Sequence, residues 1–410
     1  MFKKIAFAFI CLGWVCLMGL AAGCDPVQQG ATAEEAVPIV LTKGQQAVLA
    51  GGNDFAFDLL RACYAENGGG NLFLSPMGVS IVCSMLANGA AGQTYEEIVA
   101  AIGQKGLSLK EVNSCYQTLV TALVKADPGV KLSLANSVWT GPGLTLKKQF
   151  SEQMKTVFDA ESFQVDFAAP GTLDKVNGWC SAKTSGLIPK MFEDLDPQIR
   201  VLLINALYFK GSWVYAFPKD DTAENLFQTI SGQTVKQQMM NLTAKLQGYQ
   251  DEKVTMVKMP YGNGAFLMEA IVPNSDFKSF LANLSPAQLQ QWERPDSLQV
   301  YLSFPKFTAE FDTEEMLKPI LYGMGMRQAF TEAADFSNMS GEPLYVSEFR
   351  QKTYVSVDEE GTKAAAVTEA SLRKNAMGDS PTTMLFNRPF VYLIRESSTG
   401  AILFIGTKVQ

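Results

Sequence analysis

The sequence predicts an α+β domain in which helices and strands are mixed along one chain, and three observations support this. Of the 410 residues, 47% are hydrophobic and only 18% are charged, which supplies enough apolar material for a large core. Helical and strand-like periodicities alternate along the chain instead of gathering in separate halves. No internal repeat or low-complexity stretch divides the sequence, so we predict one large domain behind a short N-terminal segment.

Helices are expected where apolar residues recur every three or four positions. Residues 53–66 carry Phe55 and Leu59 at this spacing, and residues 76–90 follow Ser75-Pro76, a pair that suits a helix N-terminus. Further helical stretches are expected near residues 146–158, 172–182 and 313–325. Short apolar or alternating runs predict strands at residues 131–139, 201–209, 265–273, 298–307 and 388–395.

The composition excludes several classes of function. The formal charge of −7 makes nucleic acid an unsuitable partner. The chain contains no histidine, which rules out Ser/His/Asp and Cys/His hydrolases. Zinc would then need clustered cysteines, but the cysteines are scattered, and no carboxylate pair stands out. We therefore expect no enzyme activity, no metal and no cofactor.

The first 23 residues have the pattern of a bacterial lipoprotein signal peptide. Lys3 and Lys4 precede an apolar run over residues 5–22, and the end of that run, LAAGC at residues 20–24, is similar to a lipobox. The resemblance implies that Cys24 becomes the first mature residue and carries lipid. The protein would then be exported and anchored to a membrane, in the periplasm or at the cell surface.

Two alternatives to this anchor remain open. The leader could direct ordinary secretion, which would make the protein extracellular, or its apolar run could stay in the membrane as a helix. Residues 24–52 show little hydrophobic periodicity and are expected to form a flexible tether. The folded domain would then span residues 53–410.

Four cysteines fall within this domain. In an exported protein they could form disulfides, or they could serve as small buried hydrophobic residues. Their spacing favours neither alternative. They are Cys63, Cys83, Cys115 and Cys180.

The segment from Asp358 to Pro389 carries the clearest functional pattern. Read with a period of two, its even-numbered positions from 362 to 372 are small or apolar, whereas the odd-numbered ones include Lys363 and Glu369. Gly361 precedes the pattern and could act as a hinge. A polar segment around residues 378–381 follows this pattern. Such a stretch is able to be either an exposed loop or a half-buried strand.

The sequence from about residue 53 to residue 409 resembles the serpin family of protease inhibitors. Five blocks in family order carry most of the resemblance, together with the hinge segment: NLFLSP (71–76), NALYFKGSW (205–213), PKF (305–307), NRPF (387–390) and LFIG (403–406). The resemblance implies a serpin fold with three β-sheets, about nine helices and an exposed reactive-centre loop, here about residues 359–385. It also implies a monomer.

The family resemblance further implies a suicide-substrate mechanism. A target serine endopeptidase, or in some cases a cysteine endopeptidase, cuts the loop as substrate. The cut loop then inserts into the main sheet as a new strand and traps the covalent acyl-enzyme. The hinge and inserting residues carried over from the family are Glu359, Glu360, Gly361, Thr362, Ala364, Ala365, Ala366, Thr368 and Ala370.

A second set of residues carried over from the family forms a gate beneath the sheet. Ser75 and Asn205 match the serine and asparagine of that gate, and Trp213, from the same central block as Asn205, is assigned to the gate as well. The family's histidine aligns with Gln351, a side chain that both donates and accepts hydrogen bonds as neutral histidine does. The gate is therefore expected to work without a titratable member.

Family spacing places the reactive bond between Asn375 and Ala376. Arg373 and Lys374 are alternatives, because an acidic trypsin-like pocket prefers a basic side chain, and a trypsin-like target is favoured. Two other functions remain open. The chain could be a non-inhibitory serpin that acts as a chaperone, carrier or structural protein, or an unrelated hydrolase or binding lipoprotein.

Overall fold

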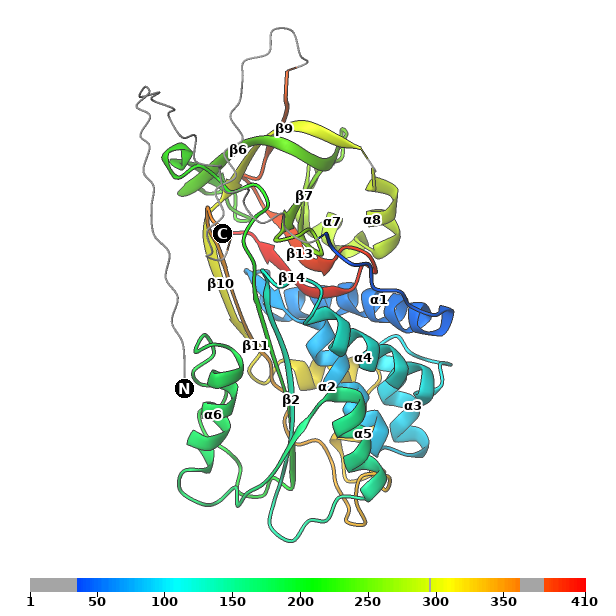
Figure 1. Ribbon diagram of the computed structural model, residues 1–410. Coiled ribbons are helices and arrows are strands. Elements are labelled where there is room, and N and C mark those ends of the chain that lie inside the picture. Colours follow the sequence, from blue (N-terminus) through cyan, green and yellow to red (C-terminus); the bar gives the residue numbers. More distant parts are fainter. Residues whose placement is uncertain (1–34, 295, 362–379) are drawn as a thin grey trace, which may run out of the picture. The chain divides into compact units, whose positions relative to one another are not determined.

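The computed structural model describes residues 35–294, 296–361 and 380–410 (Figure 1). Several expectations lie outside these ranges. They are the signal peptide, Cys24, the start of the tether, the inserting residues from Thr362 onward, and the reactive bond with its alternatives between residues 373 and 376.

The described residues contain nine α-helices. Most begin at a residue that suits a helix N-terminus: Ser75 caps α2 by accepting from the backbone of Gly78, and Ser108 opens a capping box with Glu111 at the start of α4. The helices are α1 (Lys43–Glu66), α2 (Pro76–Gly89), α3 (Gly92–Ala101), α4 (Leu109–Leu123), α5 (Lys148–Phe158), α6 (Thr172–Lys183), α7 (Phe277–Asn283), α8 (Pro286–Trp292) and α9 (Leu317–Gly323).

Fourteen strands complete the described part of the chain. The expected run 298–307 is divided in two because the strand ends at Pro305 and a new one starts at Phe307. The strands are β1 (Leu72–Leu74), β2 (Lys131–Thr140), β3 (Glu161–Gln164), β4 (Val201–Lys210), β5 (Ala223–Gln228), β6 (Thr234–Gln250), β7 (Val254–Tyr261), β8 (Phe266–Pro273), β9 (Ser297–Pro305), β10 (Phe307–Asp312), β11 (Lys352–Val357), β12 (Thr382–Leu385), β13 (Phe390–Glu396) and β14 (Ile402–Lys408).

These strands form three sheets, as expected. The largest has the order β1-β14-β13-β8-β7-β6-β9-β12, with β5 paired to β6. A second sheet has the order β3-β2-β4, in which β2 and β4 are antiparallel over ten residue pairs from Lys131↔Lys210 to Thr140↔Val201. The third sheet consists of β10 and β11 alone. The predicted α+β class, with three β-sheets and nine helices among the described residues, is confirmed.

Two hydrophobic clusters cover the two faces of the β3-β2-β4 sheet. The smaller cluster includes Trp139 of β2 and Trp179 and Cys180 of α6, so it lies between the sheet and that helix. The larger cluster joins α1 to α5 with the nine-stranded sheet. In Figure 1, α6 lies on one side of β2, and α2 to α5 lie on the other. Burial on both faces explains why β4 has a nearly continuous apolar sequence.

The predicted tether is wrong at its C-terminal end, because the folded domain begins before residue 53. Helix α1 starts at Lys43, behind a capping box in which Thr42 and Gln45 exchange hydrogen bonds. This helix contains two adjacent glycines, Gly51 and Gly52, which are unfavourable inside a helix. Gly51 is required there, because a Cβ atom would lie 1.9 Å from the carbonyl oxygen of Gly103.

Among the residues described, no helix is both long enough and apolar enough to cross a membrane.

Replacing Thr42 by alanine should destabilise the protein by about 1 kcal/mol, because the first turn of α1 loses its side-chain cap. Lys43→Ala is the matched control, since it alters the neighbouring exposed helical residue and leaves the cap in place. Denaturant unfolding of both variants measures the difference. Equal stabilities of the two variants would contradict a helix start at this position.

Candidate functional site

Residues 358–361, here called the hinge root, follow directly after β11 and are held by ion pairs. The Glu359 side chain is 8% exposed and accepts hydrogen bonds from Lys306 Nζ at 2.8 Å and Thr222 Oγ1 at 3.0 Å. Burial opposes its charge, but these two donors hold the pKa of Glu359 below its ordinary value. Glu360 pairs with Lys219 Nζ at 2.6 Å. The start of the expected inserting segment is therefore firmly anchored.

Trp213 belongs to the hinge root and not to the gate, where the sequence had placed it. Its indole Nε1 donates to the carbonyl oxygen of Asp358 at 2.9 Å, and its backbone N–H donates to that of Glu360 at 3.2 Å. Its ring stacks on Tyr261 with a centroid separation of 4.2 Å. The grouping failed because Trp213 lies eight residues beyond Asn205, which is about 26 Å along an extended chain.

Gly361 occupies a position that only glycine fits. Its φ of +83° is in the left-handed region. A Cβ atom there would lie 2.5 Å from the backbone nitrogen of Trp213 and 2.7 Å from the carbonyl oxygen of Gly211. The close pairing of Gly361 with Ser212 in an isolated bridge accounts for this crowding. Both the backbone conformation and the close packing at position 361 therefore require glycine.

Ser75 and Gln351 form the gate predicted from the sequence. The Gln351 amide accepts from the Ser75 backbone N–H at 2.8 Å and donates to the Ser75 carbonyl oxygen at 2.8 Å. The Ser75 hydroxyl donates to the carbonyl oxygen of Leu403 at 2.9 Å. This pair of bonds uses both functions of the amide, one as acceptor and one as donor.

Asn205 of β4 reaches the same place from the other side of the gate. Its Nδ2 donates to Asn136 Oδ1 on β2 at 2.8 Å, and Asn136 in turn donates to the carbonyl oxygen of Phe158 at 2.7 Å. Three of the four residues predicted for the gate, Ser75, Asn205 and Gln351, meet at Gly78 of α2. A Cβ atom on Gly78 would lie 2.5 Å from Asn205 Oδ1 and 3.2 Å from both Gln351 Nε2 and Ser75 Oγ.

Two strand edges face each other across this gate without pairing. Within the three described ranges, β4 pairs only with β2, and β11 pairs only with β10. The segment 343–351 leading into β11 has no regular structure. A cavity of about 250 Å³ lies between this segment and β4, lined by apolar side chains that include Leu202, Ile204, Leu344 and Phe349. The unpaired edges offer backbone donors and acceptors to a further strand.

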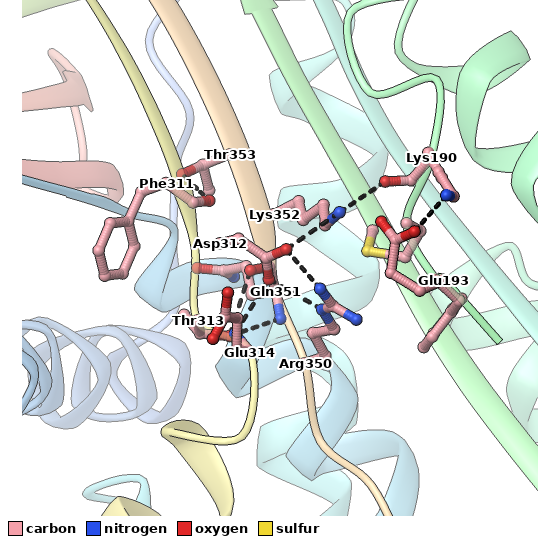
Figure 2. A network of polar contacts seen from close by, with 12 residues as sticks. Lys190, Glu193, Phe311, Asp312, Thr313, Glu314, Arg350, Gln351, Lys352 and Thr353 are labelled. Carbon is pink, nitrogen blue, oxygen red and sulfur yellow. Dashed lines mark hydrogen bonds and ion pairs between the residues drawn. The ribbon is translucent and has the colours of Figure 1, made fainter. Parts of the chain in front are cut away.

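A polar network joins the ends of β10 and β11 to the segment that precedes β4 (Figure 2). Asp312 of β10 accepts from Arg350 Nε at 2.8 Å and pairs with Lys352 Nζ at 3.0 Å. Burial opposes the charge of Asp312, but these cations hold its pKa below the ordinary value. Lys352 also donates to the carbonyl oxygen of Lys190 at 2.7 Å, in the segment between α6 and β4. Lys352 therefore links β11 to the segment that precedes β4.

Sequence reasoning missed the residues that support the predicted ones. Lys306 lies within the quoted PKF block, but nothing in that block indicated that Glu359 was its partner. Lys219, Thr222 and Asn136 likewise became functional candidates only when the fold brought them to the hinge root or the gate. These partners are more than 50 residues away in sequence, and a single sequence carries no signal for such pairings.

The four cysteines of the domain are free and buried, so the hydrophobic alternative is confirmed. Burial raises the pKa values of Cys63, Cys115 and Cys180 to about 12, which keeps these thiols protonated and unreactive. No group of three or more Cys, Asp or Glu side chains in the described part of the chain is arranged to hold a metal ion.

The three sheets and the nine helices of the described residues are those that the resemblance to serpins predicts. Comparison with known proteins agrees: residues 50–410 match the family model "Serpin (serine protease inhibitor)". The chain belongs to the serpin family, whose members are mostly protease inhibitors and generally not enzymes.

Three similar proteins illustrate the range of this family. Iripin-2 of Ixodes ricinus is 32% identical over 366 residues, covering 86% of this chain and 91% of its own. The leukocyte elastase inhibitor of Bos taurus is 31% identical over 368 residues, covering 86% and 96%. The structure of human thyroxine-binding globulin has a TM-score of 0.80 and 28% identity, covering 90% of this chain and 99% of its own.

Gly361→Ala should destabilise the protein by about 1–3 kcal/mol more than Gly264→Ala. Both glycines have positive φ, but a Cβ atom on Gly264 meets nothing within 4 Å, so that variant carries only the backbone strain. The Gly361 variant adds a clash with backbone atoms. Denaturant unfolding of the two variants measures the difference, and equal losses would show that the hinge root is not tightly packed.

Proposed function

We propose that this protein inhibits serine endopeptidases, and also cysteine endopeptidases, as a suicide substrate. A target protease cleaves the loop between residues 359 and 385, and the freed segment inserts as a strand between β4 and β11. The observation that carries the proposal is the pair of unpaired edges, which lie beside the glycine hinge at Gly361. Family membership supports it independently.

The insertion step has a sufficient driving force. The protease serine attacks the carbonyl carbon of the cleaved bond, the new amine leaves, and an acyl-enzyme remains attached to the loop. An eleven-residue strand with about one new hydrogen bond per residue, each worth roughly 1 kcal/mol, contributes on the order of 10 kcal/mol before side-chain burial. This energy is available to displace the protease before water releases it from the loop.

The period-two pattern identifies the residues that insertion depends on. The even-numbered residues Thr362, Ala364, Ala366, Thr368 and Ala370 would face the interior of the sheet. Thr362 follows directly after the fixed Gly361, so it would be among the first to enter. Ala365 and the other odd-numbered positions would face solvent and tolerate larger side chains.

The reactive bond is proposed to join Asn375 and Ala376, with Lys374 and Arg373 as alternative bait residues. A trypsin-like target is favoured by these two basic side chains. Intact-mass measurement of the C-terminal fragment released by a panel of proteases identifies the bond directly, because each alternative gives a fragment of different mass.

We further propose that the protein is a bacterial lipoprotein anchored through Cys24. The support is the lipobox-like sequence at residues 20–24 and the basic and apolar residues before it. Metabolic labelling with a fatty acid, compared between the wild type and Cys24→Ala, tests the anchor. Labelling that persists in the variant would refute it.

A non-inhibitory role is the second candidate function. Thyroxine-binding globulin, solved in complex with its hormone, shares this fold at a TM-score of 0.80 and shows that the fold is compatible with carrying a ligand. The thermal stability of the cleaved protein distinguishes the two roles. Insertion of the loop should raise it strongly, whereas cleavage of a loop that does not insert should leave it nearly unchanged.

Thr362→Arg should convert the inhibitor into a substrate, because a buried unpaired guanidinium would block the start of insertion. Glu369→Arg is the matched control, since it places the same side chain at an odd-numbered position. Denaturing electrophoresis after incubation with trypsin-like proteases measures the covalent complex. The wild type and Glu369→Arg should form it, and a complex of similar yield with Thr362→Arg would contradict insertion.

The rate of loop insertion should change less than about twofold between pH 5.5 and 7.5, because the gate residue Gln351 does not titrate. Gln351→His should introduce a step at or slightly below pH 6.5. Protonated histidine cannot accept from the Ser75 N–H, so the gate should loosen and insertion should accelerate as the pH falls. Stopped-flow fluorescence measures the rate, and a similar step in the wild type would contradict this role of Gln351.

A further inference from the structure

Lys408 is a buried lysine that neither the hinge root nor the gate uses. It is the last residue of β14 and lies opposite Phe390 of β13. Residues directly opposite each other on paired strands lie on the same face of the sheet, and so do residues two apart along one strand. Lys408 therefore shares a face with Phe390 and Tyr392. The rings of those two residues contact Phe307 at centroid separations of 6.3 and 5.3 Å. The Lys408 side chain therefore leaves β14 on the face of the sheet that carries Phe390 and Tyr392.

The charge of Lys408 has no counter-ion in its surroundings. The residue is 6% exposed, and its Nζ lies 4.8 Å from the centre of the Phe227 ring. Among the described residues, Lys408 Nζ makes this cation–π contact but no hydrogen bond or ion pair, and the atom is not fully buried. Burial lowers the pKa of Lys408 to about 8, so most of the amine still carries its charge at pH 7. A cation–π contact does not neutralise this charge, so an anionic ligand would stabilise it further.

A cavity adjoins this lysine. It has a volume of about 140 Å³ and lies between β10 and the strands β1, β13 and β14. Because a water molecule occupies about 30 Å³, the cavity has room for roughly four waters or for an anion of similar size. Lys408 is the only cation among its lining residues.

The other polar groups of the cavity suit an anion that accepts hydrogen bonds. Asn71 Oδ1 accepts from the backbone N–H groups of Val409 and Gln410, which leaves the Asn71 NH₂ group as a donor. The Thr308 hydroxyl also lines the cavity. Glu310 is the one carboxylate on its wall, but Glu310 is exposed and does not pair with Lys408.

We propose that Lys408 and this cavity bind a small oxyanion, such as phosphate or a short carboxylate, which provides the missing counter-charge. The ammonium would pair with the anion, and Asn71 and Thr308 would donate to its oxygens. This site is separate from the strand edges of the proposed inhibitory mechanism, and it requires no cleavage of the loop.

Thermal unfolding in 0–20 mM inorganic phosphate at constant ionic strength tests the site. The wild type should show a saturating rise in Tm of about 2 °C or more. Lys131→Met, which removes an exposed lysine at the end of β2, should respond in the same way, and Lys408→Met should not. Any general salting effect of phosphate is shared by both variants, so an equal response of the two would overturn the proposal.

Two further measurements separate an external anion from a counter-ion within the chain. Without phosphate, Lys408→Met should be at least as stable as the wild type, because methionine fits apolar surroundings and removes an unpaired charge. A loss of several degrees would show that Lys408 has an internal partner and would overturn the proposal. Glu310→Gln should keep the phosphate response, and its disappearance in that variant would identify Glu310 as part of the ion site and contradict the assignment made here.

Discussion

The two unpaired edges of β4 and β11 are the constraint on which the rest of the structure depends. An open strand edge invites pairing with other chains, so a stable protein must cover it or fill it. Here Lys352, at the start of β11, bonds to the carbonyl oxygen of Lys190, in the segment that precedes β4. This bond ties the two elements together at one point and leaves the hydrogen-bonding groups along both edges available.

The hinge root and the gate restrain these edges at different points. At the hinge root, Glu359 and Glu360 are tied to Lys306 and Lys219, and Gly361 is packed against the Trp213 backbone. At the gate, α2 contacts both edges through Gly78, where a single methyl group would collide with Asn205. Most of these restraints are single polar contacts between elements that lie far apart in the sequence.

The sequence was sufficient to predict the fold class and the pairing of Ser75 with Gln351, because family blocks fix the place of each residue within a known topology. It did not predict where the domain begins. The weak hydrophobic periodicity of residues 24–52 suggested a tether, yet α1 begins at Lys43 and needs Gly51 so that the Gly103 carbonyl can approach. It also misplaced Trp213. Asn205 and Trp213 share one family-like block, but Trp213 lies beyond the end of β4 and contacts the hinge root. Long-range partners such as Lys306 and Glu359 depend on the tertiary fold and cannot be read from one chain.

The buried thiols have a consequence for the conditions in which this domain is able to fold. Cys63, Cys83, Cys115 and Cys180 are free. Burial raises the pKa values of Cys63, Cys115 and Cys180, so these thiols stay protonated. No covalent cross-link joins distant parts of the described chain, so its native connectivity is the same in oxidising and in reducing surroundings. Its folding therefore needs neither an oxidant nor a disulfide isomerase, and mild reductants should leave the folded domain unchanged.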